Sequence, residues 1–109
     1  MPPLWALGWH QSRWGYKTLD DLKNVVKNYD DNRLPLDTLW SDIDYLNNYR
    51  DFEVDQTRFG GLADFVNNDL HKNHRRWVPI LDAGVAYRNG SDYEAFNDLQ
   101  TNKLYMKIG

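Results

Sequence analysis

Short apolar runs alternate along the chain with stretches whose apolar residues recur at helical spacing. Continuous runs bounded by polar or turn-forming residues are typical of buried strands. They predict strands over residues 4–9, from Thr38 into the segment 42–44, and over 76–81. A fourth strand is predicted over 104–108, where apolar and polar residues alternate.

Three stretches carry the pattern of a helix. Thr18 is predicted as the N-cap of the first, and an apolar stripe follows before residues 32–35 end it. A second helix is predicted over 62–70, where the apolar residues again lie three and four apart. A third, over 91–102, begins with the Ser-x-x-Glu spacing of a capping box.

The predicted order is β-α-β-α-β-α-β, with strands separated by about one crossover unit. Such an order predicts an α/β fold with a parallel sheet, because parallel neighbours need a long crossover connection. The 109 residues suffice for one domain and are too few for two.

Composition and charge argue against several classes of function. The formal net charge of −3 and a pI near 5.5 give no electrostatic reason to expect nucleic acid. No apolar run approaches the ~20 residues that span a bilayer, so we expect no membrane insertion. The sequence has no cysteine, no histidine–carboxylate spacing typical of zinc sites and no glycine-rich phosphate loop, so we expect no metal and no cofactor.

Aromatic residues are the main compositional feature, with five Trp and seven Tyr. Many aromatics fill a core or an interface. Here they gather with polar side chains in two blocks, residues 10–16 and 40–45, each where an apolar run ends. Strand ends form the binding face of parallel β/α proteins, so the pattern favours a carbohydrate-binding face over a closed core.

The second block contains two carboxylates, Asp42 and Asp44. On a strand they would point to one face, ~7 Å apart. Retaining glycosidases hold their carboxylates ~5.5 Å apart, but on opposite sides of the sugar. Two groups on one strand approach from the same side, so we predict that Asp44 braces a neighbouring loop.

The motifs together resemble the start of the catalytic barrel of glycoside hydrolase family 31, a family of retaining α-glucosidases. The resemblance rests on several motifs in order and at natural spacing, running nearly end to end: Arg13-Trp14-Gly15-Tyr16, Asp42-Ile43-Asp44-Tyr45, Asp51-Phe52 and Val78 to Asp82. It implies that residues 1–109 are an N-terminal fragment holding the first three or so βα units of a (β/α)8 TIM barrel, which in full needs ~250 residues.

The resemblance also implies substrate-binding residues. Asp42 matches the carboxylate that hydrogen-bonds hydroxyls of the reacting glucose, and Ile43 and Ile80 match apolar residues bordering that glucose. Trp14 matches the aromatic residue at the mouth of the pocket. A core position is the alternative for Ile43, Ile80 and Trp14.

The implied activity is hydrolysis of terminal α-linked glucose with retention, through a covalent glycosyl-enzyme intermediate. The family's nucleophile lies in a W-x-D-M-N-E type motif, which these 109 residues lack. We therefore expect no catalytic residue here, only part of a pocket for an α-glucoside that the remainder of the barrel completes. The alternatives are a stand-alone non-catalytic carbohydrate-binding module and an incomplete gene product.

One sequence of three residues indicates a cellular compartment. Asn89-Gly90-Ser91 is a glycosylation sequon, usable at Asn89 only in the secretory pathway. With the resemblance, it places the expected full-length enzyme in the lysosome, the endoplasmic reticulum or the extracellular space.

Overall fold

A three-stranded parallel sheet organises the chain. The computed structural model describes residues 1–87 and 92–106. Its sheet has the order β1-β2-β3, made of β1 (His10–Gln11), β2 (Thr38–Ser41) and β3 (Arg76–Pro79). Both strand pairs are parallel. The predicted α/β class with parallel strands is confirmed.

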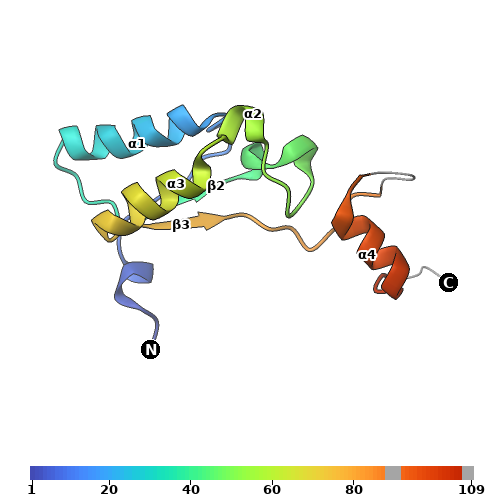
Figure 1. Cartoon of the computed structure of the whole chain (residues 1–109). Coiled ribbons are helices and arrows are strands. Elements are labelled where there is room, and N and C mark those ends of the chain that lie inside the picture. The colour runs from blue at the N-terminus through green and yellow to red at the C-terminus, as the bar shows by residue number, and fades with distance from the viewer. Residues whose placement is uncertain (88–91, 107–109) are drawn as a thin grey trace.

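Helices cover one side of this sheet, as Figure 1 shows. They are α1 (Leu19–Asp31), α2 (Gln56–Phe59) and α3 (Leu62–Phe65). α4 (Glu94–Asn102) lies beyond the carboxyl end of β3. Apolar side chains of the sheet and of the three covering helices form one core, including Leu22, Leu39 and Phe65. Helices on the outer face of a parallel sheet are the arrangement of a TIM barrel.

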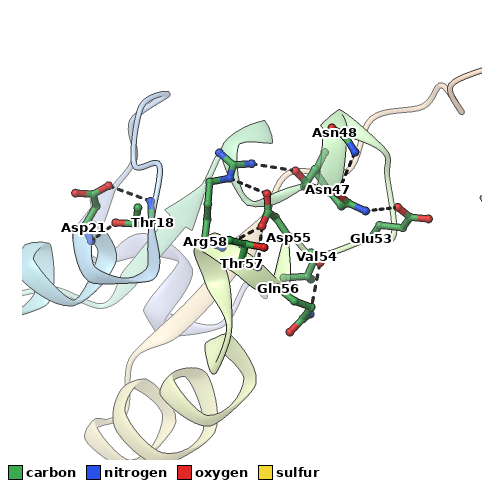
Figure 2. Close-up of polar contacts among 11 residues, drawn as sticks. Thr18, Asp21, Asn47, Asn48, Glu53, Val54, Asp55, Gln56, Thr57 and Arg58 are labelled. Atoms are coloured by element: carbon green, nitrogen blue, oxygen red, sulfur yellow. Dashed lines mark hydrogen bonds and ion pairs between the residues drawn. The ribbon is translucent and has the colours of Figure 1, made fainter.

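The local sequence explains where α1 begins and which of its faces is buried. The Asp21 amide donates to Thr18 Oγ1 over 3.1 Å, and the Thr18 amide donates to Asp21 Oδ2 over 3.0 Å. This reciprocal capping box, drawn in Figure 2, satisfies two amides at the helix start. Leu19, Leu22 and Val26 bury the predicted stripe. The predicted N-cap and helix are confirmed.

The first strand, predicted over residues 4–9, is wrong over its whole length. Residues Leu4–Leu7 form a 3₁₀ helix, and β1 begins only at His10. Leu4 and Leu7 are exposed, so no neighbouring element buries this apolar run. Pairing starts at Trp9, whose carbonyl accepts the amides of Asp37 and Thr38. An apolar run by itself does not distinguish strand from helix.

The second and third strands end earlier than predicted. β2 stops at Ser41, and a 3₁₀ helix follows over Ile43–Tyr45. The alternation of Asp42 and Asp44 along one strand is therefore wrong. β3 stops at Pro79, two residues short of the predicted end, opposite Ser41, the last residue of its partner strand β2.

The remaining predictions have mixed outcomes. The helix over 62–70 is confirmed as α3 followed by a π-helical turn, Val66–Leu70. The third helix is confirmed as α4, whose N-cap is Tyr93, while the predicted cap Ser91 lies outside the described residues. The strand over 104–108 is wrong for 104–106, where exposed Leu104 lies in irregular chain; 107–109 lie outside the described residues.

Candidate functional site

The carboxyl ends of the three strands meet at one edge of the sheet. Ser41 lies opposite Pro79, and the Ile80 amide donates to the Ser41 carbonyl over 2.9 Å. Asp42 and Ile80 therefore follow at adjacent positions just beyond the sheet. The loop 12–17 leaves β1 at the same edge. The strand register thus gathers the site residues predicted from sequence.

Asp42 is half-buried and caps the 3₁₀ helix that follows it. Its Oδ1 accepts the Ile43 amide over 2.7 Å. Its Oδ2 has no hydrogen bond to any part of the chain that the structure describes. One carboxylate oxygen therefore stays available at the sheet edge. Ile43 is half-buried and packs on the core, so its position fits both a pocket wall and a core residue.

Asp44 braces the loop that carries Trp14. The Gly15 amide donates to Asp44 Oδ2 over 2.7 Å, and only 5% of Asp44 is exposed. Gly15 has φ +124°, which glycine adopts without strain. The predicted bracing by Asp44 is confirmed. Trp14 itself is 70% exposed, so the alternative of a core tryptophan is wrong for this chain.

Ile80 is fixed from the neighbouring strand end. The Tyr45 hydroxyl donates to the Ile80 carbonyl over 2.8 Å, and the Tyr45 ring meets Trp77 edge-on at 5.6 Å. Burial, followed by the charges of Asp51 and Asp82, raises the pKa of Tyr45, which keeps the donating hydroxyl protonated. Half-buried Ile80 packs on the core and borders the edge, so both interpretations stay open.

The sequence predicts no role for Asp51. Its side chain is buried, Oδ1 accepts the Asp82 amide over 3.1 Å, and its carbonyl accepts the Tyr93 hydroxyl over 3.0 Å. These bonds tie the segment after β3 and the start of α4 to the loop after β2. Asp51-Phe52 is one of the motifs on which the family resemblance rests, but that motif does not predict which residues Asp51 contacts.

Arg50 strengthens the same connection between the loop after β2 and the start of α4. Its guanidinium pairs with Asp92 at 3.0 Å and Glu53 at 3.4 Å, and lies 5.5 Å from the centre of the Tyr93 ring. The bond to Asp92 is the main cause that raises the pKa of Arg50, while burial raises the pKa of Tyr93. Arg50 therefore links the loop after β2 to the residue before the N-cap of α4 by ion pairs.

Polar contacts brace the connection between β2 and α3, as Figure 2 shows. Asn47 Nδ2 donates to Glu53 Oε2 over 3.0 Å, and Arg58 Nε donates to Asp55 Oδ2 over 2.7 Å. Asp55 also caps α2, and the hydrogen bond from Arg58 lowers its pKa. Leu46 pairs with Val54 across the base, so the loop is a closed, ordered turn.

The face of the sheet opposite the helices carries His10 and Trp40. Trp40 Nε1 donates to His10 Nδ1 over 2.9 Å, and His10 Nε2 lies 3.1 Å from the Trp5 carbonyl. An indole nitrogen only donates and a carbonyl only accepts, which assigns the histidine proton to Nε2. Buried Thr38 Oγ1 has no hydrogen-bond partner within the described chain.

Two kinds of feature are missing from residues 1–87 and 92–106. No cluster of three His, Asp or Glu side chains is arranged to hold a metal ion. None of the helices there has both the length and the apolar character needed to cross a bilayer.

Comparison with known proteins identifies the family. The model of the glycosyl hydrolases family 31 TIM-barrel domain matches residues 1–109. The chain belongs to this family. Glucoamylase 1 of Candida albicans is 42% identical over 114 residues, covering 98% of this chain and 12% of the relative. Lysosomal acid alpha-glucosidase of Tetrahymena pyriformis is 44% identical over 87 residues, covering 77% of this chain and 9% of the relative.

A solved structure has the same fold as this chain. The crystal structure of the ER glucosidase II heterodimeric complex superposes with a TM-score of 0.89 at 30% identity. The match covers 95% of this chain and 11% of that chain. The chain thus spans about a tenth of the length of these relatives, and its three parallel strands match part of the family's TIM barrel.

Proposed function

We propose that this chain forms part of the glucose pocket of a retaining α-glucosidase that releases terminal α-linked glucose from oligo- or polysaccharides. The observation that carries the proposal is the register of β2 and β3, which brings Asp42 and Ile80 to one strand edge beside the loop of Trp14. Active sites of TIM barrels lie at this edge. Family membership adds the reaction class.

Each of the four residues has a distinct role in the proposal. Asp42 accepts hydrogen bonds from glucose hydroxyls through its available Oδ2, and bonds to a charged acceptor are the stronger kind. Exposed Trp14 packs its flat ring on the apolar C–H face of a pyranose. Ile43 and Ile80 form the apolar wall, held by their contacts with the core.

The catalytic carboxylates are proposed to lie outside these 109 residues. Retention needs a nucleophile and an acid/base group on opposite sides of the sugar. Asp44 and Asp51, the buried carboxylates of the part of the chain that the structure describes, already accept backbone amides within the fold. We therefore assign substrate contact to this chain and bond cleavage to the remainder of the barrel, which is its proposed partner.

The proposed location is the secretory pathway. A relative of known structure is an ER glucosidase, another is a lysosomal enzyme, and both match most of this chain. The sequon at Asn89, which lies outside the described residues, is proposed as a glycosylation site.

Replacement of Asp42 in the full-length enzyme tests the proposal. Asp42→Asn keeps the shape and can still accept the Ile43 amide, but it removes the charge that strengthens the bonds to glucose. Such bonds contribute about 1.5–3 kcal/mol each, so kcat/KM should fall at least about tenfold. Because the hydroxyls shift as the ring flattens, part of the loss should appear in kcat.

Asp98→Asn provides the matched control, since Asp98 is an exposed aspartate on α4. Glucose release from maltose would be measured for both variants and for the unmodified enzyme. Unchanged kinetics of a folded Asp42→Asn enzyme would remove the central contact of the proposal.

A further inference from the structure

The segment that follows β3 is held by side chains from the loop after β2. Residues 80–87 form no helix or strand, and Figure 1 shows this segment leaving β3 toward α4. Within the part of the chain that the structure describes, only its Ile80 amide bonds to another backbone group, the Ser41 carbonyl. Two side chains, those of Tyr45 and Asp51, make further bonds to its backbone.

Tyr45 and Asp51 hold backbone groups that lie two residues apart. The Tyr45 hydroxyl donates to the Ile80 carbonyl over 2.8 Å, and Asp51 Oδ1 accepts the Asp82 amide over 3.1 Å. Tyr45 and Asp51 are buried, whereas Leu81 and Asp82 are exposed. Side chains in a packed interior keep a fixed rotamer, so the two bonds attach an exposed stretch of chain to rigid groups.

Each of these two residues is itself fixed by further contacts. The Tyr45 carbonyl accepts the Asp55 amide over 3.0 Å, and the Tyr45 ring meets Trp77 edge-on at 5.6 Å. The Asp51 carbonyl accepts the Tyr93 hydroxyl over 3.0 Å. The loop after β2 therefore presents both groups in a defined position, and the segment after β3 takes its place from them.

The place of Ile80 depends on these bonds. Isoleucine has no polar group in its side chain, so hydrogen bonds orient it only through its backbone. The register of β2 and β3 sets Ile80 beside Asp42, and the bonds to its carbonyl and to the Asp82 amide keep the chain from swinging away past the end of the sheet.

We infer that Tyr45 and Asp51 are positioning residues for the glucose pocket, which hold the backbone of residues 80–82 so that Ile80 keeps its place beside Asp42. The inference rests on the proposed function, because it needs Ile80 as the wall of a glucose site. It assigns control of sugar affinity to two buried side chains that act through Ile80.

The division of the effect between KM and kcat separates positioning from a general role in stability. An apolar wall contacts the bound sugar in the ground state and in the transition state alike, so its displacement raises KM and leaves kcat unchanged. A variant that is only less stable contains less folded enzyme. Its kcat per mole of total protein falls, while the KM of the folded molecules stays the same.

Tyr45→Phe in the full-length enzyme is the first test. It keeps the ring against Trp77 and removes the bond to the Ile80 carbonyl. With maltose as the substrate, KM should rise about fourfold, the change expected when about one methyl group loses its contact, and kcat should change less than twofold.

Replacement of Asp51 is the second test. Asp51→Ala should raise the KM for maltose at least as much as Tyr45→Phe, because the Asp82 amide loses its partner. Asp51→Asn should restore KM to within about twofold of the unmodified enzyme, since an amide oxygen can still accept that bond. If Asp51→Ala does not fold, Tyr45→Phe and Asp51→Asn still decide the question.

A double-variant cycle tests whether the effect passes through Ile80. Ile80→Ala should itself raise the KM for maltose, because it removes most of the wall. Tyr45→Phe added to Ile80→Ala should change KM by less than twofold, since the side chain that it positions is gone. A fourfold increase on top of Ile80→Ala would overturn the inference.

Asp55→Ala is the matched control. Asp55 belongs to the same connection between β2 and α3, and its carboxylate also accepts backbone amides, those of Thr57 and Arg58 at 2.9 Å. It caps α2 and makes no bond to residues 80–82 in the described structure. Asp55→Ala should lower the unfolding temperature and leave KM unchanged.

Failure of the inference differs from failure of the proposed function. If Ile80→Ala raises KM while Tyr45→Phe and Asp51→Ala lower only kcat, the two residues are structural and the inference alone is rejected. If the unmodified enzyme cleaves no maltose, or if Ile80→Ala leaves KM unchanged, the glucose wall is rejected and the inference falls with it.

Discussion

The Gly15 amide donates a 2.7 Å hydrogen bond to the carboxylate of Asp44, 29 positions further along the chain. This bond joins the loop after β1 to the 3₁₀ helix after β2, so the Trp14 loop is held by the same segment that presents Asp42. The two aspartates of one short motif therefore have different tasks. Asp44 organises the edge of the sheet, and Asp42 keeps one oxygen available there.

Removal of the Asp44 carboxylate should loosen the Trp14 loop. Asp44→Ala leaves the Gly15 amide without its partner, and loss of a partner from a buried polar group costs about 1–3 kcal/mol. Amide hydrogen exchange in the segment 12–17 should therefore become about tenfold faster or more. Asp44→Asn should have a smaller effect, because an amide oxygen can still accept. Exchange that matches the control Asp98→Ala would contradict the bracing role.

Acid should weaken the link between α1 and β3. Arg75 donates to both carboxylate oxygens of Asp30, and this hydrogen bonding is the main cause that lowers the pKa of Asp30 below 3.8. A lowered pKa in the folded state gives stability that is complete above the unfolded value of about 3.8. That stability is lost as the pH falls through the lower folded-state pKa.

Thermal unfolding between pH 6 and pH 3 tests this link. Asp30→Asn should unfold at a lower temperature than the unmodified protein at pH 6, and the difference should shrink toward pH 3. The side chain of Asp30 is 53% exposed, so solvent screening keeps the effect small. A difference that stays constant, or grows in acid, would rule out a pH-dependent contribution from the pair.

Residues 1–109 produced alone should hydrolyse no aryl α-glucoside above background. The covalent route needs two carboxylates on opposite sides of a sugar, and the Asp44 carboxylate is already engaged by Gly15. Release of nitrophenol from 4-nitrophenyl α-glucoside measures this, with heat-treated chain as the control. Turnover that a glucosidase inhibitor abolishes would force Asp42 or Asp44 into a catalytic role.

The sequence by itself determined where the helix α1 begins, which face it buries and that the sheet is parallel. Thr18 and Asp21 specify the start of α1 through contacts only three residues apart, and the stripe Leu19, Leu22 and Val26 specifies its buried face. The alternation of strand and helix patterns was enough to predict a parallel sheet, which the structure has. The motifs at the strand ends were enough to indicate the family to which the chain belongs.

The tertiary structure decided which apolar runs become strands and what the polar side chains contact. The run 4–9 contains no strand, and β1 begins at His10, because pairing begins only where the Trp9 carbonyl accepts the amides of Asp37 and Thr38. The bonds from Gly15 to Asp44 and from Asp82 to Asp51 join residues about 30 positions apart in the sequence. Helix caps and stripes depend on neighbours within one or two turns, whereas these contacts exist only after the sheet has aligned its strand ends.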